Sequence, residues 1–245
     1  MKPSGKNVLV TRPGHQAPPL CRLLTAAGFN PIPLPTIDIV AMTENASIDN
    51  RLKSLSEFDY IVFISANAVT QANVHRPQWP SSSHYIAIGP KTADTMSRIG
   101  IQASTISAKP FNSEQLITQL PFALTGKRIL IIKGQGGRDF LAEAFRNKGM
   151  LVDTLDVYQR KLPICTPAIT PTLPIDYVTI TSNLALKHLT ILLPNDIEFL
   201  KKNSTFVVFS QRIANYAKEL GCQHIVVSDA AHDAGLLNAI IKTKA

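Results

Sequence analysis

Aromatic residues and cysteines are scarce in this chain of 245 residues, and their scarcity argues against several classes of protein. Aromatics make up 7% of the residues, and no cluster of Lys and Arg is interleaved with them as in proteins that stack single-stranded nucleic acid. The cysteines, Cys21, Cys165 and Cys222, form no CxxC pair. We therefore expect no nucleic-acid partner, no disulfide framework and a reducing compartment.

No apolar run has the length of a membrane span. The first residues, MKPSGKNVLVTRP, run directly into an expected strand and lack the apolar core of a signal peptide. From these features we expect a cytoplasmic protein with no membrane partner. We also expect a monomer, because the sequence indicates no long exposed apolar surface.

The common catalytic and cofactor motifs are missing as well. In GQGGRD, Asp139 stands where the dinucleotide-binding motif has its third glycine, and neither a P-loop nor a nucleophile elbow occurs. The 6 histidines sit in no metal-ligand spacing. If the chain is an enzyme, we expect it to act without a metal, a dinucleotide or another cofactor.

Positive charge is in surplus and evenly spread. The formal net charge is +8, and the sequence has no basic tail. Such a surplus favours an anionic partner, which can be a nucleic acid, a membrane or a polyanionic small molecule. A role in solubility alone explains it equally well at this point.

The chain contains an internal duplication. NVLVTRP aligns with RILIIKG, and Gly28 aligns with Gly149, at one constant offset (129 − 8 = 121 for Val8 and Ile129). The same offset aligns HYIAIGPKTADTMSRIG with TFVVFSQRIANYAKELG, whereas FDYIVFISANAV aligns with IDYVTITSNLAL at a shorter one (176 − 59 = 117). A repeat near half the chain length indicates two similar domains and not a solenoid.

Each copy alternates expected strands with expected helices. This alternation predicts an α/β fold with two parallel sheets covered on both faces. In each copy the second strand is long and alternates apolar with polar side chains, over residues 28–40 and 151–163. We expect both stretches to be continuous strands.

Ligands of parallel α/β sheets bind beyond the carboxyl ends of the strands, where loops lead into helix N-termini. Small, polar or basic residues occupy nearly all these positions, which favours a ligand with many carboxylates or phosphates. Taken alone, each position is more typical of an ordinary helix cap. A basic enzyme of phosphosugars or nucleotides is one alternative, with Gly134–Gly137 as its only glycine-rich loop. The candidate binding residues are Arg12, Ser65, Ala66, Asn67, Gly89, Lys91, Thr92, Gly134, Arg138, Ser182, Asn183, Ser210 and Arg212.

The order and spacing of several segments resemble the uroporphyrinogen-III synthase family over almost the whole chain. The segments are NVLVTRP, FDYIVFISANAV, AIGPKTADTM, RILIIKGQGGRDFLAEAFRNKGMLVDTLDVYQ and a final strand, helix, strand, helix unit. The resemblance implies two similar parallel-sheet α/β domains joined by a two-stranded β ribbon at about 30–40 and 151–162. Domain 1 would be discontinuous, with residues 1–35 and 162–245, and domain 2 would comprise 36–161. The duplication alone also allows two contiguous domains.

The resemblance further implies a cofactor-free cyclising lyase of tetrapyrrole (heme) biosynthesis. Such an enzyme closes the linear tetrapyrrole hydroxymethylbilane to uroporphyrinogen III, with loss of water and inversion of ring D through a spiro intermediate. The substrate carries eight carboxylates, which fits the net charge of +8. A transient contact with the preceding pathway enzyme is a further expectation.

By resemblance, Tyr158 matches the family's tyrosine at the inter-domain cleft. A phenol, with a pKa of about 10, can donate a hydrogen bond to the departing hydroxyl without ionising. By itself Tyr158 is also typical of a strand aromatic that packs, as Ile37 does in the first copy. Thr92 and Ser182 match family positions that face the cleft, and Arg12 and Arg138 could pair with acetate or propionate groups.

The sequence departs from the family at Ser210-Gln211-Arg212, where the family commonly carries a Gly-Pro-Thr type sequence. The charge of Arg212 can replace lost contacts there. The departure also leaves an alternative open, a non-catalytic tetrapyrrole-binding or regulatory paralogue on the same fold.

Overall fold

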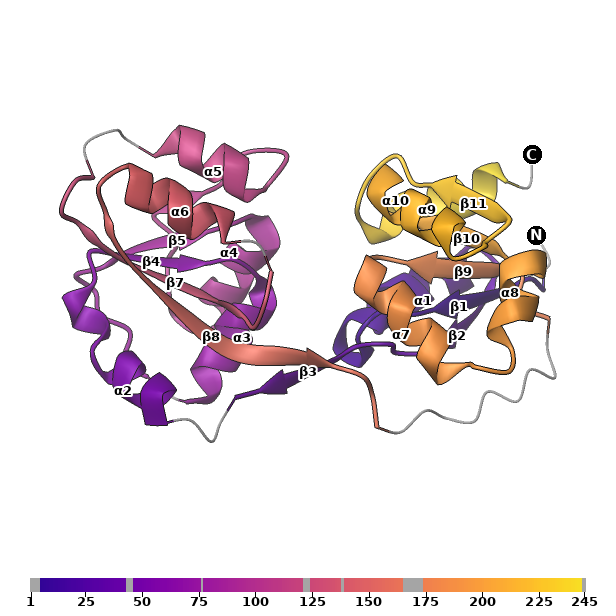
Figure 1. Ribbon diagram of the computed structural model, residues 1–245, viewed down its shortest axis with the longest axis horizontal. Helices are drawn as coiled ribbons and strands as arrows, with labels where there is room; N and C mark the ends of the chain where they lie inside the picture. Colours follow the sequence, from indigo (N-terminus) through magenta and orange to yellow (C-terminus); the bar gives the residue numbers. More distant parts are fainter. Residues whose placement is uncertain are drawn as a thin grey trace. The chain divides into compact units, whose positions relative to one another are not determined.

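The computed structural model describes residues 5–42, 46–75, 77–120, 124–137, 139–164 and 174–243. The chain forms two compact units, each built around its own sheet (Figure 1). Unit 1 comprises Met1–Asp38 and Lys161–Ala245, and unit 2 comprises Ile39–Arg160. The chain therefore passes from one unit to the other twice, after Asp38 and after Arg160.

Unit 1 contains a five-stranded sheet whose paired strands are parallel, in the order β11-β10-β9-β1-β2. Its strands are β1 (Asn7–Val10), β2 (Asn30–Pro33), β9 (Tyr177–Ile180), β10 (Thr205–Val208) and β11 (His224–Val227). Its helices are the 3-10 turn η1 (Gly14–Gln16), α1 (Ala17–Ala26), α7 (Asn183–Leu192), α8 (Ile197–Asn203), α9 (Gln211–Glu219) and α10 (Asp233–Lys242).

Unit 2 contains a six-stranded sheet in the order β3-β8-β7-β4-β5-β6. Its strands are β3 (Asp38–Ala41), β4 (Tyr60–Phe63), β5 (His84–Ala87), β6 (Thr105–Ile106), β7 (Arg128–Gly134) and β8 (Leu151–Lys161). Its helices are α2 (Ala46–Lys53), the 3-10 turn η2 (Leu55–Glu57), α3 (Ala66–Val74), α4 (Pro90–Ser97), α5 (Ser113–Gln119) and α6 (Phe140–Asn147). The predicted α/β class with parallel sheets is confirmed.

Helices cover both faces of each sheet, because the strand side chains alternate between two apolar layers. In β4, Ile61 and Phe63 pack into the core under α2, α3 and α4, whereas Val62 packs into the core under α5 and α6. In unit 1 one core lies under α7, α8 and α9 and the other under α1 and α10. The buried strands read as continuous apolar runs for this reason.

The duplication holds at the level of strand register. Asn7 pairs with Asn30 between β1 and β2, and the residues 121 positions later, Arg128 and Leu151, pair between β7 and β8. The pair Thr205–Tyr177 of unit 1 likewise corresponds to His84–Tyr60 in unit 2. The two copies therefore share one topology, and the carboxyl ends of equivalent strands carry equivalent loops.

The prediction of one continuous strand over residues 28–40 was wrong. The stretch forms β2 in the unit 1 sheet and β3 in the unit 2 sheet, with Leu34–Ile37 between them. Leu34 and Thr36 donate their N–H groups to the carbonyls of Val10 and Thr11, so the chain follows the unit 1 sheet as far as Thr36. The second copy does form one long strand, β8.

Prolines explain why β2 is an outer strand. Asn30 and Leu34 donate to the β1 side, to Lys6 and Val10, whereas Pro31, Pro33 and Pro35 occupy the alternate positions. Proline has no N–H group, so the outer side of β2 offers few donors to another strand. In unit 2, β8 carries no proline at the equivalent positions and has β3 as its outer neighbour.

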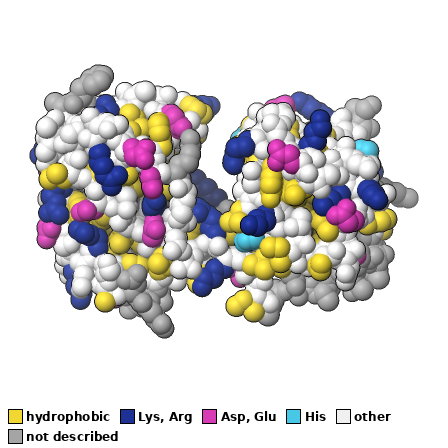
Figure 2. All heavy atoms as spheres, viewed as in Figure 1, with side chains coloured by type: hydrophobic (Ala, Val, Ile, Leu, Met, Phe, Trp, Pro, Cys, Tyr) yellow, Lys and Arg dark blue, Asp and Glu magenta, His cyan; other side chains and the backbone are white. Residues whose placement is uncertain are grey.

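Two further features differ from what the first copy suggested. Helix α8 lies where the first copy has the Pro- and Ser-rich stretch of residues 76–83, and β11 spans four residues where β6, its counterpart in the first copy, spans two. Among the described residues, no helix is long and apolar enough to cross a membrane. Figure 2 shows Lys and Arg side chains interspersed with Asp and Glu on the visible face of each unit.

Candidate functional site

Tyr158 lies where β8 passes the carboxyl end of β7 in unit 2, next to the loop that follows β4. Its side chain is buried, at 1% exposure. The phenol oxygen accepts a hydrogen bond from Nη2 of Arg160 at 2.9 Å and lies 3.3 Å from Oγ of Ser65. The side chains of Tyr158, Ser65 and Arg160, from the ends of β4 and β8, thus form one hydrogen-bonded cluster.

Gly134, the last residue of β7, makes room for the tyrosine ring. A Cβ atom at this position would lie 2.3 Å from Cζ of Tyr158, far inside van der Waals contact. The N–H of the next residue, Gln135, donates to the Tyr158 carbonyl at 2.7 Å. The ring and the backbone of the β7 end therefore fit together only because residue 134 has no side chain.

A register shift in β8 turns Tyr158 toward this position. Lys133 pairs with Asp156, but Gly134 pairs with Tyr158, so Val157 is the extra residue of a bulge. Bulges redirect a side chain and are common beside functional sites. Val157 and Tyr158 are both buried against the same core, which successive residues of a regular strand cannot do.

Ser65 serves as the N-cap of α3. Its Oγ accepts a hydrogen bond from the N–H of Ala68 at 3.0 Å, which fixes the hydroxyl that faces Tyr158. Ala66 and Asn67 form the first turn of this helix. The helix start thus presents backbone N–H groups next to the phenol, as an anion-binding position would require.

The β5 end carries the other predicted residues of unit 2. Gly89 is the N-cap of α4 and is buried, Lys91 is exposed, and Thr92 is buried in the first turn. A Cβ on Gly89 would lie 3.2 Å from Cβ of Phe111, a partly exposed residue with a φ of 57°. A left-handed backbone is uncommon for a residue other than glycine and often marks a functional position.

Asp156 and Lys133 flank the bulge on the neighbouring strands. Burial raises the pKa of the Asp156 carboxyl group, and the positive charge of Lys133 partly opposes that rise. Lys133 itself forms an ion pair with Asp139 at 2.9 Å. Asp156 can consequently hold a proton at a higher pH than an exposed aspartate.

Unit 1 places its predicted residues at equivalent helix starts. Ser182 caps α7 by accepting from the N–H of Ala185 at 3.1 Å. Asn183 follows it, and its buried Oδ1 has no hydrogen-bond partner in the described part of the chain. Ser210 is the N-cap residue of α9 without a side-chain cap bond, and Arg212, in the first turn of α9, is exposed.

Arg12 is engaged within unit 1. Its guanidinium lies 2.7 Å from Oδ1 of Asp233 as an ion pair and 5.1 Å from the ring centroid of Phe209. Burial lowers the pKa of Arg12, and the charge of Asp233 opposes that effect. Arg12 thus anchors the start of α10 to the end of β1. Arg138, which was also predicted to pair with substrate carboxylates, lies outside the described residues.

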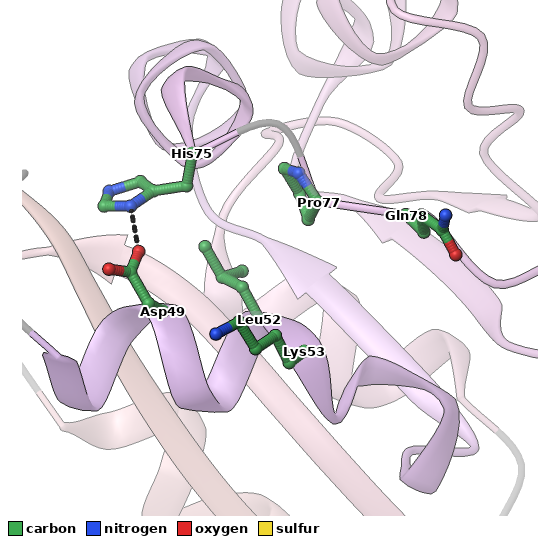
Figure 3. Close-up of a pocket in the computed structure, with 6 residues that line it drawn as sticks. All are labelled: Asp49, Leu52, Lys53, His75, Pro77 and Gln78. Atoms are coloured by element: carbon green, nitrogen blue, oxygen red, sulfur yellow. Dashed lines mark hydrogen bonds and ion pairs between the residues drawn. The ribbon is translucent and has the colours of Figure 1, made fainter.

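A surface cavity of about 410 Å³ lies elsewhere on unit 2, between α2 and the end of α3. Figure 3 shows His75 and Asp49 facing each other beside it, with Nδ1 of His75 2.7 Å from Oδ1 of Asp49. None of the predicted site residues lines this cavity. Within the described ranges, no cluster of three or more His, Cys, Asp or Glu side chains could hold a metal ion.

The sequence-based prediction missed Arg160, Asp233 and the contact of Gly134 with Tyr158. Arg160 had a usable signal, because residues two apart on a strand share a face. The Gly134 contact had none, since it depends on a one-residue bulge within β8. Asp233 lies far along the chain, and only the folded unit brings it to Arg12.

Together, these features define a two-unit α/β protein with helix N-termini at the carboxyl ends of its strands and a buried tyrosine held there by a serine and an arginine. The family model described as uroporphyrinogen-III synthase HemD matches residues 19–238. The chain belongs to the uroporphyrinogen-III synthase family, a family of cyclising lyases, and the resemblance noted in the sequence is confirmed.

Comparisons with individual members of the family agree with this assignment. The uroporphyrinogen-III synthase of Salmonella typhimurium is 32% identical over 250 residues, covering 96% of this chain and 99% of the relative. That of Escherichia coli is 30% identical over 246 residues, with 96% and 99% covered. Among solved structures, the Helicobacter pylori uroporphyrinogen-III synthetase has a TM-score of 0.65 at 15% identity, covering 97% of this chain and 99% of that one. At that identity the structure supports the fold alone.

Proposed function

We propose that this chain cyclises hydroxymethylbilane to uroporphyrinogen III with loss of water and inversion of ring D. Its family membership and full-length similarity to named synthases support the proposal. The observation that carries it within the molecule is the Tyr158 hydroxyl, held by Ser65 and Arg160 at the carboxyl ends of β4 and β8.

The reaction requires few catalytic groups from the protein. The electron-rich pyrrole assists departure of the hydroxyl group, so the C–O bond breaks as the oxygen receives a proton and leaves as water. Tyr158 supplies that proton as a general acid. The ring D carbon that carries the bridge to ring C attacks the cationic carbon and forms the spiro intermediate. The bond from this ring D carbon to the bridge then breaks, and the other α carbon of ring D attacks the bridge carbon, which is now cationic, so that ring D is inverted. The proton lost from that α carbon as the pyrrole regains aromaticity returns to the Tyr158 oxygen. The net change is loss of one water.

The remaining residues bind the carboxylates of the substrate in this proposal. The starts of α3 and α4 in unit 2 and of α7 and α9 in unit 1 offer N–H groups and the side chains of Lys91, Thr92, Asn183 and Arg212. Charge-assisted hydrogen bonds of this kind suit acetate and propionate groups. The polycarboxylate substrate, a cytoplasmic location and a transient contact with the preceding enzyme stay predictions.

One observation favours the alternative of a protein that binds tetrapyrrole without cyclising it. In Ser210-Gln211-Arg212, the segment that differs from the family, the Ser210 side chain makes no cap hydrogen bond to α9. One experiment separates the two functions. Purified protein is supplied with enzymatically generated hydroxymethylbilane, and the oxidised products are separated into type I and type III isomers. The type III isomer supports the lyase, whereas the type I isomer alone, from spontaneous closure, would leave a protein that binds without cyclising.

A further inference from the structure

Arg160 contacts the oxygen and the ring of Tyr158, and the reaction proposed above assigns these contacts no role. It stands two residues after Tyr158 on β8, so both side chains lie on the same face of the strand. Its Nη2 lies 2.9 Å from the Tyr158 oxygen, and its guanidinium carbon lies 5.2 Å from the ring centroid. In the described part of the chain, no carboxylate forms an ion pair with Arg160.

We propose that Arg160 is a positioning residue that directs the Tyr158 proton toward the departing hydroxyl group, an inference that rests on the proposed function. Arginine is always protonated and carries donors only, so Arg160 must donate and the phenol oxygen must accept. The proton of the phenol is then directed away from Arg160. It is available to Ser65 or to a substrate oxygen that takes the place of Ser65.

The same hydrogen bond also acts during proton transfer. Negative charge develops on the phenol oxygen as its proton leaves, and a donor that already points at this atom stabilises the charge without rearranging. Tyr158 is buried, so water competes little for its oxygen. Arg160 is exposed, so solvent screens the long-range field of its charge. Arg160 therefore stabilises the phenol oxygen mainly through its one directed hydrogen bond.

A different role for Arg160 makes a different prediction. If its exposed guanidinium binds a substrate carboxylate, removing it raises KM and the loss does not depend on Tyr158. If it acts through Tyr158, removing it lowers kcat, and the loss disappears once the phenol is gone. A double-mutant cycle separates the two roles.

The cycle comprises wild type, Arg160→Met, Tyr158→Phe and the double variant, each assayed for kcat and KM of type III formation. We expect Arg160→Met to lower kcat on the order of tenfold, as for one hydrogen bond to a charged group. In the Tyr158→Phe background the same change should lower kcat less than about twofold. Equal losses in both backgrounds, or a loss confined to KM, would overturn the proposal.

Two further variants control for charge and folding. Arg146 lies exposed in the last turn of α6, so Arg146→Met removes one positive charge from the same unit, and we expect unchanged kcat. Arg160→Lys keeps a donor and should retain more activity than Arg160→Met. Thermal unfolding of each variant checks that the folded fraction is the same.

A second readout does not depend on activity. In protein carrying ¹³C at the tyrosine Cζ atoms, the Tyr158 signal is assigned by its loss in Tyr158→Phe. The signal should shift in Arg160→Met and stay in place in Arg146→Met. If wild type forms no type III isomer but this shift is seen, the proposed function fails while the hydrogen bond stands. If Arg160→Met leaves the signal unmoved, the positioning role fails by itself.

Discussion

The ring of Tyr158 packs so closely against Gly134 that only glycine fits at residue 134, since a Cβ there would lie 2.3 Å from the phenol carbon Cζ. The glycine ends β7, and the tyrosine reaches it through the bulge at Val157. The position of the phenol is thus set by a missing side chain on the neighbouring strand. Ser65 and Arg160 then hold its oxygen.

Gly134→Ala should displace the Tyr158 ring and pull its hydroxyl away from Ser65 and Arg160. We expect kcat to fall and the free energy of unfolding to drop by about 1–3 kcal/mol, as for overpacked sites. Gly14→Ala is the matched control, because its Cβ would meet only Cγ of Pro35 at 3.8 Å, an ordinary contact. Wild-type kcat and stability in Gly134→Ala would contradict the packing described.

The Arg12–Asp233 pair should matter for stability more than an exposed pair. Asp233→Asn leaves the buried Arg12 guanidinium without its counter-ion, so we expect unfolding in urea to become easier by about 3 kcal/mol. The control is Asp229→Asn, because the Lys242–Asp229 pair has side chains 68% and 74% exposed. Its loss should cost less than about 1 kcal/mol. Similar costs for both variants would mean that burial of Arg12 is unimportant.

Asn183 should affect substrate binding more than chemistry. The buried Oδ1 of Asn183 has no partner at the start of α7 in the described part of the chain, so a donor of the substrate, such as a pyrrole N–H, can pair with it. We expect Asn183→Leu to raise KM by about tenfold, as for one lost hydrogen bond of about 1.4 kcal/mol, with little change in kcat. Steady-state kinetics of type III formation measure both constants. An unchanged KM would remove Asn183 from the binding site.

Cys222 should make stability fall at alkaline pH. Burial raises the pKa of its thiol from 9.0 to about 11, so the folded state favours the protonated form. The unfolded thiol is half deprotonated near pH 9, and the folded one near pH 11. The stabilisation is therefore complete below pH 9 and is lost as the pH rises to about 11. The stability difference between wild type and Cys222→Ala should shrink over that interval, and a constant difference would show that the buried thiol does not titrate as inferred.

Much of the fold follows from sequence because the duplication constrains it. Val8 and Ile129 align in the sequence, and their strands have the same partners and register in the two sheets. The break between β2 and β3 was missed although the alternation changes phase there, because Leu34 and Ile37 are three residues apart and not two. Periodicity reports which face a side chain takes, and it does not report which sheet the strand joins.

The candidate site was predictable only at the level of strand ends. Ser65 and Ser182 follow apolar strands and begin helices, so their capping positions could be inferred from local sequence. The engagement of Arg12 by Asp233 could not, since its partner is distant along the chain. Neither could the fit of Tyr158 over Gly134, which depends on backbone geometry at a single bulge.

The most direct test of the central claim is the isomer ratio formed by wild type, Tyr158→Phe and Tyr85→Phe from hydroxymethylbilane. Tyr85 is the matched control, because it is a buried tyrosine of unit 2 whose hydroxyl donates to the carbonyl of Pro80 at 2.9 Å. We predict predominantly type III isomer from wild type and from Tyr85→Phe, and a rate of type III formation at least about a hundredfold lower from Tyr158→Phe, as for loss of a general acid. Undiminished type III formation by Tyr158→Phe would contradict the role assigned to the phenol.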